Sequence, residues 1–205
     1  MKSTLIITML IFFMIVTSVK NDELIAQTQT NYPNETIKTI HTRKSVRHFT
    51  DKAVTKEQLE TILKAGMAAP TAMNGQSWEF YVITERKMLE ELAKGLPSAQ
   101  MLKQASAAIV VCGNTDKVGK IDEAQFWMLD CANASENMLL AIESLGLGGL
   151  WTALYPDKDR MDFARKTLKI PTNLMPLNCI PIGYPTGEDT PKDKYKPEKI
   201  HWNQW

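Results

Sequence analysis

A short basic segment is the first part of the sequence whose residue types and spacing could bind an anion. Four potential cations and a hydroxyl lie within six residues, contributed by Arg43, Lys44, Ser45, Arg47 and His48. In an extended conformation, Arg43, Ser45 and Arg47 would point to the same side. One guanidinium group can donate two parallel hydrogen bonds to the oxygens of a phosphate, and a serine hydroxyl adds a neutral donor. The segment therefore predicts a phosphate-binding site, and a solvated basic surface strip is the alternative.

The second candidate is a turn-rich stretch at residues 69–78, which reads APTAMNGQSW. It separates an expected helix from an expected strand. Small residues let the backbone come close to a planar ligand, while the amides of Asn74 and Gln76 supply both donors and acceptors. The pattern is compatible with a ligand-binding loop and with an ordinary helix-to-strand turn.

Three glycines between Leu145 and Trp151 form the third candidate, and they do not predict a dinucleotide site. That motif places a strand before the glycines and a helix after them, whereas here the helix comes first. Gly146 is better explained as the C-cap of that helix, followed by a close-packed turn.

The remaining chemical patterns point away from metal and nucleophilic catalysis. The three histidines lack metal-ligand spacing with Cys, Asp or Glu, and no Gly-x-Ser-x-Gly elbow is present. Cys112 and Cys179 fall in apolar strands and Cys131 on a long helix, so we expect buried, unreactive thiols. We therefore predict no metal site and name no catalytic side chain.

Composition describes a globular chain with no bulk attraction for polyanions. The 205 residues are 44% hydrophobic, and 24 Lys and Arg against 23 Asp and Glu leave a formal net charge of +1. This balance removes the main electrostatic support for nucleic-acid or membrane-surface binding. The length suits one domain with a full core, and three scattered cysteines are too few for a disulfide framework.

The N-terminus reads as a targeting segment. Residues 5–16 are apolar except for Thr8 and are shorter than the roughly 20 residues that a spanning helix needs. We expect residues 1–26 to be a signal peptide or, alternatively, an N-terminal anchor, with cleavage after Ser18 or Ala26. The protein would then be exported, periplasmic or secreted, with membrane contact only if the segment is uncleaved. Residues 27–40 read as a polar tether to a folded domain at 41–205.

Hydrophobic periodicity predicts a mixture of helices and strands in the folded part. Thr55 and Gln58 form a capping-box pattern that opens a helix ending before Pro70. A strand at 78–83 precedes a helix at 85–94, which we expect to lie between a Thr84 cap and Gly95. The unbroken apolar run at 107–112 predicts a strand covered on both faces.

The C-terminal half continues the alternation. Residues 126–145 predict the longest helix, with apolar residues from Ala134 to Leu145 on one face. A strand is expected at 150–154, then a helix capped by Asp157, and finally a strand at 177–184 interrupted by Pro181.

Taken in order, these segments resemble the FMN-dependent nitroreductase family from about Thr42 to Trp205. The shared motifs are Arg-x-Ser-x-Arg-x-Phe at residue 43, Pro-Thr-x-x-Asn-x-Gln-x-Trp at 70, the long helix from Asp130 into the glycines, and Pro-x-Gly-Tyr-Pro at 181. The resemblance implies an α+β sandwich, a mainly antiparallel sheet with flanking helices. It also implies an intertwined homodimer that binds FMN at its interface.

The resemblance assigns roles around the FMN. Arg43 and Ser45 would bind the phosphate and ribityl chain, and Arg47 would lie near the pyrimidine edge of the ring. The 70–74 residues would come from the partner subunit, and Trp151 would begin a stretch facing the flavin N5. The implied cofactor-binding residues are Arg43, Lys44, Ser45, Arg47, Pro70, Thr71, Ala72, Asn74, Trp151, Thr152, Ala153, Lys194 and Lys196.

This chain departs from the family pattern at several of those positions. Thr71 stands where many relatives have Ser. Lys196 stands where many have Arg. The lysine ammonium group is a point charge, whereas the arginine guanidinium group is planar and can donate two parallel hydrogen bonds. Some relatives carry an acidic residue and a glycine where this chain has Ala153 and Leu154.

The implied reaction is a ping-pong transfer of hydride from NADH or NADPH, through the flavin, to a small electron-poor acceptor such as a nitroaromatic or quinone. Two alternatives stay open. One is an exported flavin- or ligand-binding protein without turnover, and the other is a flavin enzyme of the same fold with different chemistry, such as dehalogenation.

Overall fold

The computed structural model describes residues 32–117 and 126–205, in a chain that divides into two units at residues 1–38 and 39–205. The predicted leader at 1–26 lies outside the described residues. None of the described helices is both long and apolar enough to cross a membrane.

The elements are α2 (Glu35–Thr42), α3 (Lys56–Met67), η1 (Ala72–Asn74), β1 (Trp78–Ile83), α4 (Arg86–Gly95), η2 (Pro97–Lys103), β2 (Ala107–Asn114), η3 (Thr115–Lys117), α5 (Phe126–Ser144), β3 (Gly148–Gly149), β4 (Thr152–Ala153), α6 (Lys158–Leu168), β5 (Leu174–Gly183) and η5 (Pro197–Lys199).

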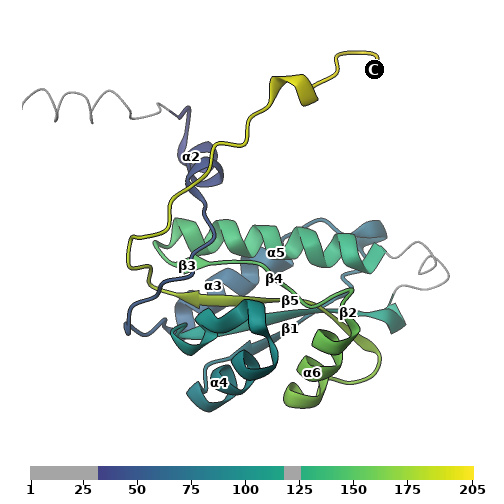
Figure 1. The fold of residues 1–205 in the computed structure, drawn as a ribbon. Coiled ribbons are helices and arrows are strands. Elements are labelled where there is room, and N and C mark those ends of the chain that lie inside the picture. The colour runs from purple at the N-terminus through teal and green to yellow at the C-terminus, as the bar shows by residue number, and fades with distance from the viewer. Residues whose placement is uncertain (1–31, 118–125) are drawn as a thin grey trace, which may run out of the picture. The chain divides into compact units, whose positions relative to one another are not determined.

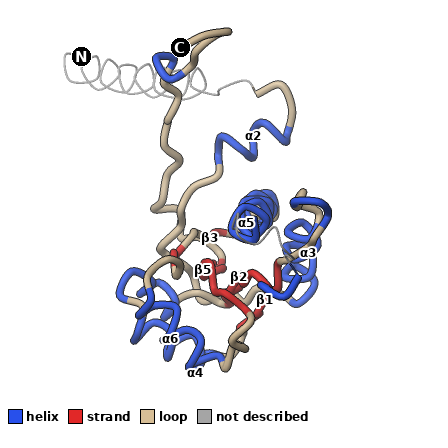
Figure 2. Tube along the Cα trace, turned by 90° about the vertical axis from the view of Figure 1, so that its right-hand side faces the viewer, coloured by secondary structure: helices blue, strands red, loops and turns tan. Residues whose placement is uncertain are grey.

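The second unit is built around one antiparallel sheet with strand order β1-β2-β5-β3, and β4 also pairs with β5. Helices α3 and α5 cover one face, and α4 and α6 cover the other (Figures 1 and 2). This arrangement confirms the expected α+β fold with a mainly antiparallel sheet.

Strand β2 explains why its sequence is apolar without a break. Ile109 and Val111 belong to the hydrophobic cluster under α3 and α5, whereas Ala108 and Val110 belong to the cluster under α4 and α6. Successive side chains point to opposite faces, so a strand covered on both faces must be apolar at every position. The prediction for this strand is confirmed.

The predicted helix ends are correct for α3 and α6 but not for α4. Thr55 accepts a hydrogen bond from the Gln58 N–H, and the Gln58 side chain returns one to the Thr55 N–H, which completes the capping box. Asp157 caps α6 by accepting from the Arg160 N–H at 3.1 Å. Helix α4 begins one residue later than expected, so Glu85 rather than Thr84 is its N-cap, and no side chain caps it.

The strands near the C-terminal half differ from the prediction in two ways. Within the stretch expected as a strand at 150–154, only Thr152–Ala153 is a strand, β4, and the other short strand, β3 at Gly148–Gly149, precedes the stretch. Strand β5 begins earlier than expected, at Leu174, and Pro181 does not interrupt it, because Pro181 pairs in register with Ala108. The irregularity lies instead around Leu177, whose carbonyl accepts from the backbone N–H groups of Leu154 and Tyr155.

Part of the expected polar tether is helical. Helix α2 runs from Glu35 to Thr42, with the Asn34 side chain accepting from the Ile37 N–H at 3.0 Å, and none of its residues is buried. An asparagine at this position supplies the acceptor that a helix N-terminus lacks. The end of the tether at residue 40 is therefore inside a helix and not in an extended linker.

Replacing Thr55 with Ala is expected to lower the free energy of unfolding by about 1 kcal/mol, because the Gln58 N–H loses its acceptor. Thr84→Ala is the matched control, since Thr84 is exposed and does not cap α4, and its effect should stay within about 0.5 kcal/mol. Urea unfolding of both variants measures the difference, and equal losses would contradict the cap assignment.

Candidate functional site

The basic segment, residues 43–49, lies beside strand β3 in an extended conformation. Ser45 forms a parallel bridge with Gly149, whose carbonyl accepts from the Val46 N–H at 3.1 Å. Val46 is fully buried, whereas Ser45 and Arg47 on either side are exposed. A Cβ on Gly148 would meet the Val46 side chain at 2.6 Å, so this glycine permits the close approach. The helix-to-strand turn therefore supports the basic segment by packing.

A cavity of about 440 Å³ opens over this segment, and we call it the basic cavity. It gathers five of the residues predicted from the sequence, which are Arg43, Lys44, Ser45, Arg47 and Lys194. Four further lining residues were missed, namely Glu188, Asp189, Thr190 and Lys192. The dense run of charged residues after the last strand was the available signal. The basic segment is thus the floor of a cavity rather than a plain surface strip.

Two glutamates of α5 hold the first two cations of the cavity. Lys44 Nζ lies 3.0 Å from Glu143 Oε1, and both side chains are mostly buried. Arg43 Nε lies 3.3 Å from Glu136 Oε1. Positions seven apart on a helix lie on the same side, which is why both glutamates reach the basic segment. These pairs orient the two cations and neutralise part of their charge.

Arg47 keeps more of its charge available. One guanidinium nitrogen, Nη1, donates to the Ser45 carbonyl at 3.3 Å. Within the described part of the chain, no carboxylate lies within ion-pair distance of Arg47 or Lys194. The cavity therefore retains uncompensated positive charge facing its interior, which suits an anionic ligand.

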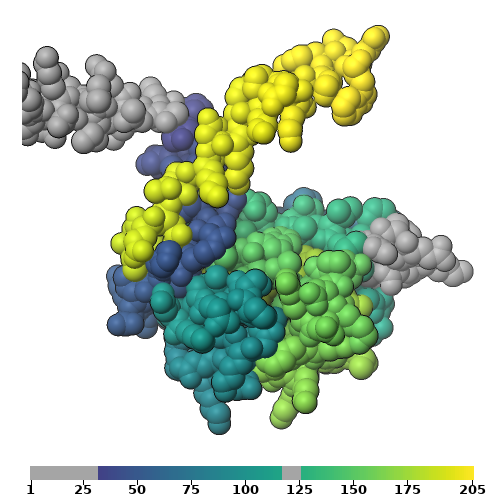
Figure 3. Space-filling model, in the orientation of Figure 1, coloured from purple at the N-terminus to yellow at the C-terminus, as the bar shows by residue number. Residues whose placement is uncertain are grey.

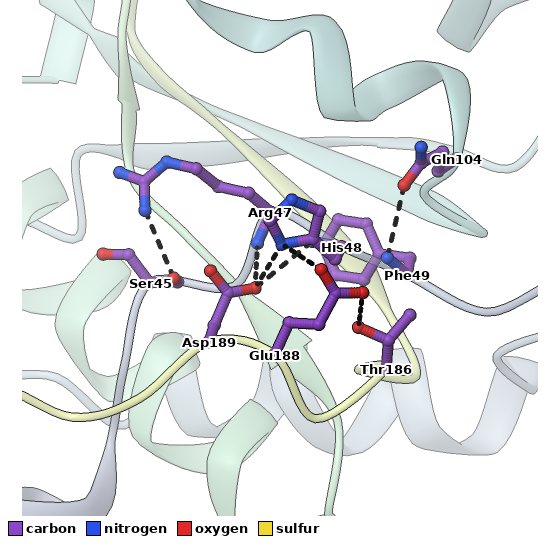
Figure 4. A network of polar contacts seen from close by, with 8 residues as sticks. All are labelled: Ser45, Arg47, His48, Phe49, Gln104, Thr186, Glu188 and Asp189. Atoms are coloured by element: carbon purple, nitrogen blue, oxygen red, sulfur yellow. Dashed lines mark hydrogen bonds and ion pairs between the residues drawn. The ribbon is translucent and has the colours of Figure 1, made fainter.

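Asp189 fastens the C-terminal segment, residues 184–205, to the basic segment. Its Oδ2 accepts from the backbone N–H groups of Arg47 at 2.8 Å and His48 at 3.3 Å, and lies 3.2 Å from His48 Nδ1 (Figure 4). Burial works against the charged form, but these hydrogen bonds outweigh it and hold the pKa of Asp189 below its usual value. Beyond this contact the C-terminal residues project away from the body of the second unit (Figure 3).

The 70–77 loop lies apart from the basic cavity. Its predicted residues Pro70, Thr71, Ala72 and Asn74 do not line the cavity, and Ala72 is held instead by Asp130 near the start of α5. By contrast, the basic segment is held through Lys44 by a glutamate near the end of α5. Within one chain, the two predicted parts of the site, the 70–77 loop and the basic segment, therefore do not meet.

The other predicted residues, Trp151, Thr152, Ala153, Lys194 and Lys196, also differ in their burial and in whether they line the basic cavity. Trp151 is partly exposed and follows β3, so it lies close in the chain to the residues that pair with the basic segment. Thr152 is buried in β4, and Ala153 is exposed. Lys196 is exposed at the start of η5 and does not line the basic cavity, unlike Lys194.

Comparison with known proteins decides the family. The family model described as "Nitroreductase family" matches residues 40–184. This protein belongs to the nitroreductase family. A curated relative from Archaeoglobus fulgidus, named "Putative NADH dehydrogenase/NAD(P)H nitroreductase", is 40% identical over 174 residues, which cover 83% of this chain and 99% of that protein.

Solved structures agree with this membership. A crystal structure from Parabacteroides distasonis, which carries the same name as the A. fulgidus protein, is 50% identical, with a TM-score of 0.79 over 84% of this chain and 99% of that one. An FMN-dependent nitroreductase from Clostridium difficile is 27% identical, with a TM-score of 0.74 over 82% and 98% of the two chains. This nitroreductase-family protein is therefore an oxidoreductase with the fold of those structures.

The three cysteines belong to the core and not to the site. Cys112, Cys131 and Cys179 are all buried and free. Burial raises the pKa of Cys112 and of Cys179 to about 12, and it raises that of Cys131 as well. Thiolate is the reactive form, so these thiols are inert in the folded protein. The prediction of buried cysteines is confirmed.

A thiol reagent is therefore expected to label none of the three cysteines of the folded protein at about pH 8, and all three after denaturation, because only unfolding exposes the thiols and restores an ordinary pKa. Ellman's reagent measures both states, and the denatured sample gives the reference amplitude. A thiol that reacts rapidly before unfolding would contradict the assignment.

Proposed function

We propose that the protein is an FMN-dependent oxidoreductase in which NADH or NADPH delivers hydride and a small electron-poor acceptor, a nitroaromatic or a quinone, takes it up in a second half-reaction. Membership of the nitroreductase family and the FMN dependence named for the C. difficile relative support this function. The observation that carries it is the basic cavity, where cations and a hydroxyl from distant parts of the chain meet.

The chemistry of the basic cavity fits the phosphate of FMN. Five cationic side chains line it against two acidic ones, Glu188 and Asp189. The carboxylate of Asp189 is turned to the backbone N–H groups of Arg47 and His48, which satisfies it locally. Arg43 engages Glu136 through Nε, and a planar guanidinium can contact a phosphate with its remaining nitrogens. A phosphate dianion would offset the excess of positive charge among these lining residues.

The residues of this chain would bind and orient the cofactor. Arg43 and Ser45 would bind the phosphate and the adjoining chain, Lys194 would close on the phosphate from the C-terminal segment, and Arg47 would place positive charge toward the ring. When bound, FMN supplies a ring that can accept a hydride and pass electrons on. Proximity of donor or acceptor to that ring would account for the rate, so we assign no side chain as acid or base.

The proposal includes a homodimer, because one chain does not bring both halves of the site together. The 70–77 loop is bound to Asp130, and the basic segment is bound through Lys44 to Glu143. These two α5 residues lie about 20 Å apart along the helix axis and on different sides of it. A second copy can place its 70–77 loop beside the first copy's basic cavity, which a single chain does not achieve.

Replacing Arg43 with Ala is expected to weaken FMN binding at least tenfold, because a charge-assisted hydrogen bond to the phosphate contributes about 1.5–3 kcal/mol. Flavin absorbance after purification and titration of the apoprotein with FMN measure the loss. Lys166→Ala is the matched control, since Lys166 is an exposed cation on α6 and does not line the cavity.

The same spectra test the function itself. A yellow protein that is bleached by NADH or NADPH and recoloured by a nitroaromatic or quinone would support it. A yellow protein inert to both reductants would favour a binding role, and a colourless protein that takes up no FMN would overturn the proposal. Analysis of the products distinguishes reduction from other flavin chemistry such as dehalogenation.

We also propose export, on the basis of the apolar segment at residues 5–16. Cleavage after Ser18 or Ala26 is expected because small residues precede both positions. Intact mass measurement of the protein from its native host tests this, and a mass that includes Met1–Ala26 would indicate an uncleaved anchor. Free nicotinamide cofactors are scarce outside the cytoplasm, so NADH and NADPH are the donors proposed for the purified enzyme, and an exported enzyme would use another reductant in its host.

A further inference from the structure

Within the described part of the chain, the buried carboxylate of Asp130 accepts its hydrogen bonds from one loop. Its residue is 3% exposed, and its two oxygens accept separate hydrogen bonds, Oδ1 from the Ala72 N–H at 2.8 Å and Oδ2 from the Ser77 hydroxyl at 2.9 Å. Among the described residues, no cation forms an ion pair with it. A buried charge without a partner is strongly unfavourable, so burial of Asp130 depends on the loop being in place.

The 70–77 loop in turn depends on such an anchor. Three of its residues that are not glycine, Met73, Asn74 and Gln76, have φ angles of 50°, 56° and 48°. This left-handed region is disfavoured for residues with a Cβ, and it persists only where surrounding contacts impose it. Within the loop, the Thr71 hydroxyl accepts from the Gln76 N–H at 3.2 Å, which closes the turn but does not attach it to the rest of the protein.

Helix α5 attaches the loop and its entry through one side. Besides Asp130, Asn133 Nδ2 donates to the Pro70 carbonyl at 3.3 Å, and Asn137 Nδ2 donates to the Ala65 carbonyl at 3.1 Å. Spacings of three and seven residues place these three side chains along one side of the helix. Asp130 is the only charged member of this row, and it alone binds the loop at two points, Ala72 and Ser77.

We propose that Asp130 is a positioning residue that fixes the 70–77 loop in the conformation that receives the electron acceptor. The proposal rests on the proposed function, in which this loop covers the flavin of a second copy. Ala72 lies between Thr71 and Met73, and the Met73 side chain is 74% exposed in the single chain. Holding Ala72 therefore determines where the exposed part of the loop is presented. The basic cavity is held by other α5 residues, so Asp130 acts on acceptor binding and not on the phosphate.

The test compares Asp130→Ala with Asp130→Asn in the full-length protein loaded with FMN. The alanine variant loses both acceptors, and the expected result is an increase of about tenfold in KM for a quinone acceptor, with a smaller loss of FMN affinity than Arg43→Ala causes, because the phosphate contacts of the basic cavity remain. In the asparagine variant the amide oxygen still accepts from Ala72, and the amide nitrogen can donate to the Ser77 oxygen, so KM should return to near the original value.

Hydrogen exchange of the apoprotein gives a readout that does not need activity. The Ala72 amide should exchange at least about tenfold faster in Asp130→Ala than in Asp130→Asn, because only the latter keeps its acceptor. Asp162→Ala is the matched control, since Asp162 is an exposed partner of Lys158 on α6, and neither readout should change.

Each outcome decides the proposal. A folded Asp130→Ala protein with unchanged acceptor KM and unchanged exchange at Ala72 would overturn it, and so would a loss of FMN affinity as large as that of Arg43→Ala. If Asp130→Ala does not fold, Ser77→Ala removes one of the two bonds and should show a smaller increase in both readouts, with no change again counting against the proposal. If the unaltered protein binds no FMN, the proposed function fails, whereas exchange still reports whether Asp130 fixes the loop.

Discussion

Pairing of β2 with β5 is the interaction on which the rest of the structure depends. Both strands are buried on both faces, so each helical layer packs against the same two strands. Strand β5 also pairs with β3 and β4 along its other edge, and its end at Gly183 leads directly into the C-terminal segment. The basic segment forms two isolated β-bridges near this end of β5. Ser45 pairs with Gly149 in β3, and Phe49 pairs with Pro185, just after Gly183. The basic cavity is therefore an extension of the central sheet.

Charge in the cavity is arranged so that each cation has a defined direction. Buried Glu143 and half-exposed Glu136 orient Lys44 and Arg43 from α5, while Asp189 is satisfied mainly by backbone N–H groups. A carboxylate that accepts hydrogen bonds from backbone N–H groups is stabilised in its charged form and held in position. It therefore has less tendency to form ion pairs with mobile lysine or arginine side chains. This arrangement leaves the remaining guanidinium nitrogens of Arg43 and the lysines of the C-terminal segment to meet an anion, and it leaves Arg47 to face the ring in the proposed enzyme. In the proposed enzyme that anion is the phosphate of FMN.

Helix α5 connects the two parts of the proposed site without bringing them together in one chain. One side binds the 70–77 loop through Asp130, and residues nearer its end bind the basic segment. A rigid helix of 19 residues keeps these parts at a constant separation. In the proposed dimer, this separation lets each copy contribute the loop to one site and the cations to the other. The packing of α5 would then set the geometry of both sites.

Local patterns in the sequence determined the long helix, the capping box of α3, the doubly buried strand and the basic segment, because each depends on neighbours within a few residues. They misplaced the α4 cap by one residue, and they misplaced the course of β5, where sheet pairing overrode the expected effect of Pro181. Only the tertiary structure brought Asp189 to the basic segment, 142 residues away from Arg47, and placed Asp130 under the 70–77 loop. Such contacts join residues distant in the chain, and no local periodicity or spacing encodes them.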